Sequence, residues 1–270
     1  MGCRKSRTVR ERLGLTLLVV LGTNGASQAN PAASLDNAAE RYRPELTAAV
    51  EQCLTGAKTL RERIAAKDLD GARKAWITSR VGWERSEVFT SGFTSELDAT
   101  IDAWPSAVTG FHFIEARLFG ARQMDVLEAT DALIFHLTDL RLKIRDTRLT
   151  GQGMLEGTAK LAYEIGESKA EGGESRFSGT SLDDMRNNAD GIEAAYRIVF
   201  ATELAARNPA LAQALSTKIG QLKAQLKAAN LSEIDADQIR TTSEDLVITL
   251  QRAAPVLGLE RPSLSDLAQQ

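Results

Sequence analysis

The feature that most constrains this chain is a helical repeat of apolar residues that continues from about residue 36 to residue 253. Over long segments apolar side chains recur every three to four residues, and no β-type alternation is sustained for more than a few residues. Proline, which interrupts helices, occurs only six times in 270 residues. The sequence therefore predicts an all-α fold.

Breaks in this periodicity divide the chain into two sets of about four helices. Glycine, proline and asparagine mark most of the breaks. The stretch TGQG at 150–153 is expected to separate the two sets, and a glycine- and serine-rich loop is expected at 170–182. Two sets of this size predict a helical bundle or a pair of bundles. The expected helices are 36–66 (as one helix or two), 70–89, 105–119, 126–145, 155–169, 183–206, 210–229 and 232–253.

Residues 1–29 have the pattern of a secretory signal peptide. A basic segment precedes the short apolar run at 13–21, and small residues lead to a cleavage site between Ala29 and Asn30. The apolar run is too short to cross a bilayer, and no later stretch approaches 18 apolar residues. We therefore expect a signal peptide over 1–29, an exported helical domain over 30–270, and no transmembrane span in the mature chain.

Charge and cysteine content exclude several classes of protein. The full chain has a formal net charge of −3, and residues 1–29 hold five basic side chains and one acidic side chain, so their removal leaves −7. An acidic surface argues against nucleic-acid binding and mildly favours cations. Cys3 precedes the apolar run, so Cys53 is the single cysteine of the mature chain. A scaffold held by disulfides is therefore excluded.

The segment GFHFIEARLFG at 110–120 contains one of the two histidines of the chain, His112, three residues before Glu115. On a helix these two side chains lie about 60° apart, at the edge of an apolar stripe, so they can converge at a half-buried position. Helical bundles use this spacing for Glu/His metal pairs, and imidazole with carboxylate suits iron, zinc or manganese. An ordinary hydrogen bond at a helix edge explains the same two residues equally well.

The segment AWITSRVGWERSEVF at 75–89 carries charged residues among tryptophans. On a helix Trp76, Arg80, Trp83 and Glu87 share one face, with Glu84 at its edge. A charged residue between two tryptophans is not on a plain solvated face, so we expect Arg80 to pair with one of the two glutamates. Glu84 and Glu87 can point the same way, and paired carboxylates near a histidine suit a hard or borderline cation.

Acidic residues gather in two further segments. They are Asp98 and Asp102, spaced i, i+4 before the histidine helix, and Glu164, Glu167 and Glu171 on one helix face, with Glu174 in the loop that follows. Helix capping is an alternative explanation for the first pair. A solvated helix face neutralised by Lys169 is an alternative explanation for the second group.

Five motifs follow one another in a fixed order along residues 36–255. They read Trp-x3-Arg-x3-Glu-x2-Glu, Leu-Asp-x3-Asp, Gly-Phe-His-x-Ile-Glu, Lys-x2-Gly-x-Glu-x-Arg-Phe-Ser and Ser-Leu-x-Asp-x3-Asn-x2-Gly. This order resembles the imelysin-like M75 family, and most closely its EfeO/EfeM branch. The resemblance implies two four-helix bundles with metal ligands at a cleft between helices. It also implies periplasmic binding of iron (Fe²⁺ or Fe³⁺), with zinc or copper as alternatives, for delivery to an iron permease and other uptake components.

The resemblance also assigns roles to single residues. By this match the metal ligands are His112 and Glu115 of the HxxE pair, the paired Glu84 and Glu87, Asp102 before the HxxE helix, and Glu174 of the Gly-Glu-Glu loop, with Arg80 orienting one of the paired glutamates. Three positions depart from the family's pattern: Gly173 replaces one glutamate of that loop, Gly179 a frequent histidine, and Trp83 a tyrosine. The span before residue 36 leaves no room for the cupredoxin domain of many EfeO proteins, so the chain resembles the short EfeM form.

The leading hypothesis is therefore a periplasmic metal-binding component of an EfeUOB-like iron-uptake system, without catalytic residues. One alternative is a zinc-dependent M75-type peptidase, although HExxH is absent and HxxEH would require a histidine at Ala116. A serine triad is poorly supplied, because His136 is the only other histidine. The other alternative is a metal-free helical module that interacts with a polymer or a partner protein.

Overall fold

The computed structural model describes residues 1–2, 31–103 and 106–263, and within these ranges every regular element is a helix. The predicted all-α fold is therefore confirmed. The predicted signal peptide falls almost wholly on residues 3–30, which lie outside the described residues. Of the helices in the described ranges, none combines the length and the apolar character that crossing a bilayer requires.

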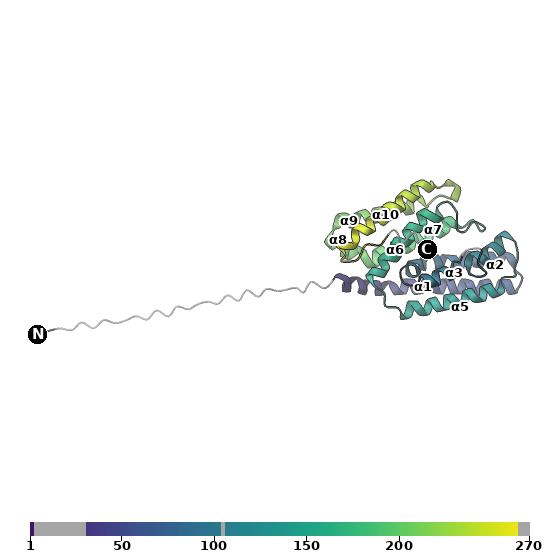
Figure 1. The fold of residues 1–270 in the computed structure, drawn as a ribbon, viewed down its shortest axis with the longest axis horizontal. Helices are drawn as coiled ribbons and strands as arrows, with labels where there is room; N and C mark the ends of the chain where they lie inside the picture. The colour runs from purple at the N-terminus through teal and green to yellow at the C-terminus, as the bar shows by residue number, and fades with distance from the viewer. Residues whose placement is uncertain (3–30, 104–105, 264–270) are drawn as a thin grey trace.

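Three long helices form the first group of the fold (Figure 1). They are α1 (Pro31–Ala65), α2 (Leu69–Phe93) and α5 (Leu127–Asp146). Helix α1 packs against both α2 and α5, because its apolar stripe, including Leu46, Val50 and Leu54, is buried between them. Two short helices, α3 (Ser95–Ile101) and α4 (Gly110–Glu115), connect α2 to α5.

Helix α4, which carries His112, starts later than the sequence predicts. Residues 106–109 form turns and bends, so the predicted start at residue 105 is wrong. Gly110 has φ +86°, a backbone conformation that glycine adopts without strain, and a side chain there would lie 2.9 Å from the backbone nitrogen of Ala103. After Glu115 the helix continues as the π turn η1 (Ala116–Gly120).

The second group follows the loop after α5 and contains four longer helices. These are α6 (Gly151–Glu164) with its π-turn extension η2 (Ile165–Lys169), α7 (Ser181–Ala195) with the π turn η3 (Tyr196–Phe200) and α8 (Ala201–Arg207), α9 (Pro209–Gln225), and α10 (Ala236–Val256). Two groups of about four helices agree with the expected division of the chain. In the first group the short helices α3 and α4 stand where a fourth long helix would be.

Two helix boundaries in the second group differ from the prediction, and capping explains both. Thr150 accepts a hydrogen bond from the Gly153 amide at 3.1 Å, so most of the expected break at 150–153 forms the first turn of α6. Asp235 caps α10 by accepting from the Gln238 amide at 3.0 Å. Helix α10 therefore starts at Ala236 rather than at residue 232.

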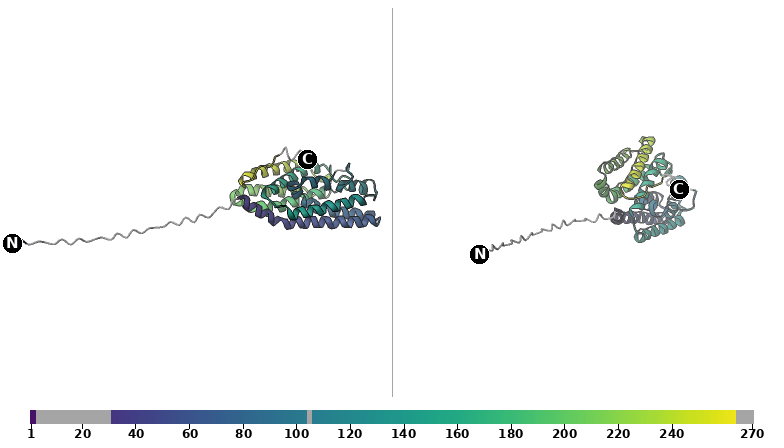
Figure 2. Two further views of the ribbon diagram at one scale, coloured as in Figure 1. Left: turned by 60° about the horizontal axis from the view of Figure 1, so that its bottom comes forward. Right: turned by 60° about the vertical axis from the view of Figure 1, so that its left-hand side comes forward.

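Helix α2 joins the two groups. In Figure 1, α6 and α7 lie between the α1–α2–α5 layer and helices α9 and α10, and the left view of Figure 2 shows the purple, blue and teal helices of the first group running alongside one another. The backbones of α2 and α6 approach closely, because a Cβ on Gly157 would overlap the carbonyl oxygen of Val88. This contact brings the face of α2 that carries Glu84 and Glu87 against α6 and α7.

Candidate metal centre

The charged face predicted for α2 is buried at the junction of the two groups. Arg80 and Glu84 are at most 1% exposed and Glu87 is 4% exposed, while Trp76 and Trp83 are fully buried. Burial of this many charges is costly unless each finds a partner. The pairing of these groups therefore decides what the region can bind.

Arg80 is the partner of three carboxylates. Its guanidinium pairs with Glu84 and with Asp102 at the end of α3, and lies 3.4 Å from Asp184 on α7. The guanidinium carbon also lies over the ring of Phe111, at 5.2 Å from the centroid. Arg80 thus holds Glu84, as the sequence predicts, and also fixes Asp102, which comes from a different element.

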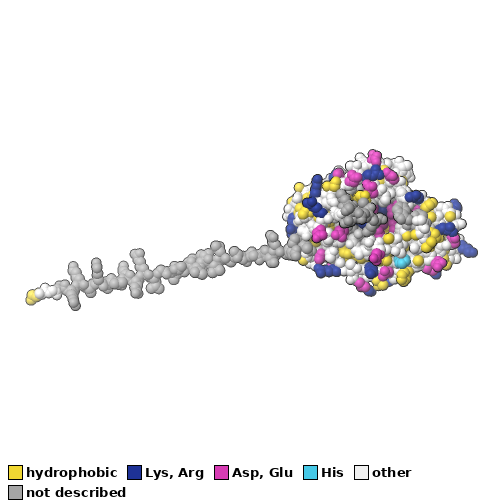
Figure 3. Space-filling model, in the orientation of Figure 1, with side chains coloured by type: hydrophobic (Ala, Val, Ile, Leu, Met, Phe, Trp, Pro, Cys, Tyr) yellow, Lys and Arg dark blue, Asp and Glu magenta, His cyan; other side chains and the backbone are white. Residues whose placement is uncertain are grey.

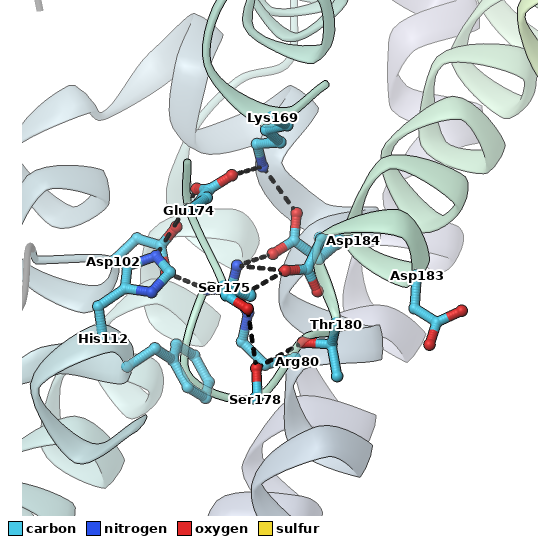
Figure 4. A network of polar contacts seen from close by, with 12 residues as sticks. Arg80, Asp102, His112, Lys169, Glu174, Ser175, Ser178, Thr180, Asp183 and Asp184 are labelled. Atoms are coloured by element: carbon cyan, nitrogen blue, oxygen red, sulfur yellow. Dashed lines mark hydrogen bonds and ion pairs between the residues drawn. The ribbon is translucent and has the colours of Figure 1, made fainter. Parts of the chain in front are cut away.

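His112 faces three carboxylates. Its Nδ1 lies 3.1 Å from Glu115 Oε2, and its Nε2 lies 3.5 Å from Asp102 Oδ1 and 3.7 Å from Glu174 Oε1. In Figure 4 the side chains of Asp102, His112 and Glu174 point toward one another, whereas Asp183 points away. The half-buried position expected for His112 is in fact almost fully buried, because its side chain is 2% exposed.

Glu115 ties the histidine helix to the loop between η2 and α7. Its Oε1 accepts hydrogen bonds from the Phe177 amide at 3.0 Å, and from the Ser178 amide and hydroxyl, both at 2.7 Å. Its Oε2 faces His112. Burial acts to raise the pKa of Glu115, but His112 and Ser178 hold it below its usual value. Both oxygens are therefore used to position protein groups.

Lys169 was not predicted to belong to the centre. The alternative in which it neutralises a solvated helix face does not hold for Lys169 itself, because it is 2% exposed and its Nζ contacts buried carboxylates. Lys169 Nζ lies 2.9 Å from Glu84 Oε2, 3.2 Å from Glu87 Oε2 and 3.2 Å from Glu174 Oε2. The pattern that could have revealed it is its place in the fourth motif, three residues before Gly172.

Helix α7 supplies two further polar groups that were not singled out from the sequence. Asn188 is fully buried and its Nδ2 donates to Glu84 Oε2 at 2.8 Å and to Glu87 Oε2 at 2.6 Å. Asp184 accepts a hydrogen bond from Ser175 and pairs with Arg80. Asp184 and Asn188 are the Asp and Asn of the fifth motif, which marked them without indicating their role.

In the centre, burial and neighbouring charges often shift the pKa of the same side chain in opposite directions. Burial acts to raise the pKa of Asp102, but Arg80 and His112 hold it well below its usual range. Burial alone would lower the pKa of His112, yet Asp102, with Glu115 and Glu174, raises it well above its ordinary value. Burial and the neighbouring charge of Glu84 raise the pKa of Glu87 well above its ordinary value. The metal-free centre therefore retains protons that a bound cation could displace.

A cavity of about 300 Å³ reaches these groups from the surface and is lined by Asp98, Asp102, His112, Glu164, Lys169 and Glu174 among others. Burial and the charge of Asp98 raise the pKa of Glu164 to about 7. Glu167 and Glu171, expected on the same helix face as Glu164, instead lie 3.9 Å and 2.6 Å from Arg240 at the surface. Only Glu164 of that trio therefore borders the cavity.

Among the residues that the structure describes, two sets of side chains could each hold a metal ion, with their ligand atoms within 4.8 Å of one another. We call Asp102, His112 and Glu174 the histidine set, and Glu84, Glu87 and Asp102 the glutamate set. All predicted ligands except Glu115 belong to one of these sets. Glu115 borders the histidine set through His112.

Comparison with known proteins places this arrangement in a family. The family model for imelysin, peptidase M75, matches residues 38–109 and 106–254. A protein named iron uptake system component EfeO from Escherichia coli O157:H7 is 31% identical over 190 residues, which are 65% of this chain and 50% of that protein. Proteins of the same name from Escherichia coli K12 and Shigella flexneri are 30% identical over 190 residues, with the same coverage. The chain thus spans about half the length of the curated relatives it matches, and it belongs to the imelysin (M75) family.

Proposed function

We propose that this protein binds iron, or a similar cation, as the metal-binding component of an iron-uptake system. The observation that carries the proposal is the histidine set. One imidazole and two carboxylates reach a single point from α4, from the end of α3 and from the loop after η2. The same residues border a cavity that an ion can enter.

The chemistry of the histidine set suits a borderline divalent ion. Imidazole and carboxylate together favour iron, zinc or manganese over purely hard or purely soft ions. The three side chains are at most 12% exposed, so water screens the ion–ligand contacts weakly and each contact is stronger than it would be in bulk water. Glu115 and Arg80 support the ligands rather than bind the ion, because they fix the orientation of His112 and Asp102.

Release of the ion can be driven by protons. Burial acts to lower the pKa of His112, but Asp102, Glu115 and Glu174 raise it above its ordinary value, so the imidazole holds a proton more readily than a free histidine does. A metal ion requires the neutral imidazole and must displace that proton. Affinity therefore falls as the pH falls, which would favour release in an acidic microenvironment beside a transporter.

The cellular setting of the proposal rests on the N-terminal pattern and on the names of the relatives. Export by the segment at residues 1–29 would place the domain in the periplasm, where it would deliver iron to a permease. The relatives are named as components of an iron-uptake system. N-terminal sequencing of the protein exported by a Gram-negative host tests the proposed export and cleavage. The expected result is a mature chain that starts at Asn30.

The function itself is tested by equilibrium titration with Fe²⁺ under anaerobic conditions. We expect the wild-type protein to bind one ion and His112→Ala to lose at least tenfold in affinity, while His136→Ala, on α5, keeps the wild-type value. Equal binding by wild type and His112→Ala would remove the histidine set from the function. Chelator-sensitive hydrolysis would instead favour the zinc peptidase, and absence of any bound metal would favour the interaction module.

A further inference from the structure

The ammonium of Lys169 occupies a position where a metal ion would otherwise fit. A lysine ammonium has three N–H donors, and here each has a carboxylate oxygen within reach, on Glu84, Glu87 and Glu174. The side chain is 2% exposed, so its partners are these protein groups rather than water. Figure 4 shows Lys169 reaching Glu174 across the centre.

The π turn η2 places the ammonium there. In a regular α-helix Glu164 and Lys169, five residues apart, would point about 140° away from each other. Residues Ile165–Lys169 instead form a π turn, in which the Ala170 amide donates to the Ile165 carbonyl at 3.1 Å. As a result both Glu164 and Lys169 line the same cavity.

The position of the ammonium coincides with one of the two candidate ligand sets. Two of the three carboxylates of the glutamate set, those of Glu84 and Glu87, contact Lys169 Nζ directly. Glu174 divides its two oxygens, with Oε1 toward His112 and Oε2 toward Lys169. The centre therefore consists of two adjoining cation positions, one facing His112 and the other filled by Lys169.

We propose that Lys169 is a built-in cation that fills the glutamate set and thereby limits the centre to one metal ion. This assignment rests on the proposed function for the identity of the ion at the histidine set. It makes Lys169 the residue that determines metal stoichiometry. An uncharged side chain of similar length would remove the ammonium from Glu87 and from Glu84 Oε2, while Glu84 Oε1 keeps Arg80. This change would open an all-carboxylate position, which a hard divalent ion such as Mn²⁺ prefers.

The test counts ions in Lys169→Met, Lys169→Arg and wild type of the full chain. Mn²⁺ alone is the probe, and native mass spectrometry gives the number of ions bound to folded protein at neutral pH. We expect Lys169→Met to bind one ion more than wild type. Lys169→Arg retains a positive charge at the same place and is expected to bind the wild-type number.

The outcome separates this inference from the proposed function. If wild type and Lys169→Met each bind one ion, the inference is wrong and the proposed function stands. If wild type binds no Mn²⁺ but Lys169→Met binds one ion, the inference about Lys169 holds, and the Fe²⁺ titration alone decides whether the proposed function fails. An extra ion in Lys169→Arg, or two ions in wild type, would also overturn the inference. Should Lys169→Met be unfolded without metal, the inference requires that Mn²⁺ restores its helical circular dichroism, and failure to do so contradicts it.

Discussion

Replacement of Arg80 by methionine should strongly destabilise the protein at neutral pH. Arg80 is 1% exposed and neutralises Glu84 and Asp102 while lying 3.4 Å from Asp184. Methionine fills much of the same volume but removes the guanidinium that these three buried carboxylates share as a counter-ion. Breaking a buried ion pair from one side costs about 3–5 kcal/mol. For a domain of this size that corresponds to a fall in Tm of roughly 6–20 °C.

The difference in stability between the wild type and Arg80→Met should become smaller as the pH falls, because the substitution changes the pKa values of the carboxylates. In the wild type Arg80 and His112 hold the pKa of folded Asp102 below its value in the unfolded chain. Ionised Asp102 therefore contributes to the free energy of unfolding at every pH above the unfolded pKa, and this contribution is lost only in strong acid. Without Arg80, burial dominates and raises the pKa of Asp102 and of Glu84. The variant can then protonate these carboxylates in mild acid, so the stability difference narrows between pH 7 and pH 5.

Urea unfolding followed by circular dichroism at both pH values measures this difference. A matched control is Arg141→Met, because Arg141 pairs with Glu51 at 3.3 Å but both side chains are at least 40% exposed. The control should change stability by less than about 1 kcal/mol. A loss for Arg80→Met no larger than that of the control, or a loss that grows toward pH 5, would refute the account of Arg80 as the counter-ion of the buried carboxylates.

Three further predictions test the loop, the proton coupling and the helix packing. Glu115→Gln weakens the hydrogen bonds that position His112 and Ser178, so Fe²⁺ affinity should fall about 10–100-fold in calorimetric titration. Unchanged affinity would contradict the positioning role of Glu115. Because the pKa of His112 is raised, Fe²⁺ binding at neutral pH should release close to one proton from that side chain. Calorimetry in buffers of different ionisation enthalpy measures the number of protons released. No proton release would argue against a charged His112. Gly157→Ala should lower stability by about 1–3 kcal/mol, because the added Cβ meets the Val88 carbonyl. Gly220→Ala on α9 has open space around it and should raise stability by about 0.4–1 kcal/mol. Thermal unfolding that ranks the two variants in the opposite order would contradict the close packing of α2 and α6.

Helical periodicity predicted the fold well because it reports which faces are buried. The apolar stripes of α1 and α5 gave their extents to within a few residues, and the all-α class followed. The start of α4 was missed because it depends on Gly110 at φ +86°, a backbone conformation that periodicity does not encode. The start of α6 was missed because TGQG resembles a loop, while Gly151 packs against Leu35 of α1 and Gly153 packs against Phe93 of α2.

The candidate centre was only partly predictable from the sequence. The spacing of Glu84, Glu87 and His112 indicated shared faces, and the structure brings these residues into one cluster. The place of Lys169 in the centre was not predicted, because at 100° per residue of a regular helix it would point away from Glu164, whereas the π turn η2 brings both side chains to the same cavity. The ion pair between Arg80 on α2 and Asp102 at the end of α3 joins residues 22 positions apart in the chain, so no local pattern could reveal it.

Acidic and basic side chains are interspersed over the face seen in Figure 3. Large apolar side chains that are well exposed in the described ranges, such as Val108 at 81% and Phe135 at 69%, come from separate elements.

The most direct measurement of the central claim is a crystal structure of the iron-loaded protein with anomalous data collected at the iron edge. The account predicts one anomalous peak within bonding distance of Asp102, His112 and Glu174, with Lys169 still in contact with Glu84 and Glu87. A peak between Glu84 and Glu87 with Lys169 displaced, or a peak away from His112, would contradict it.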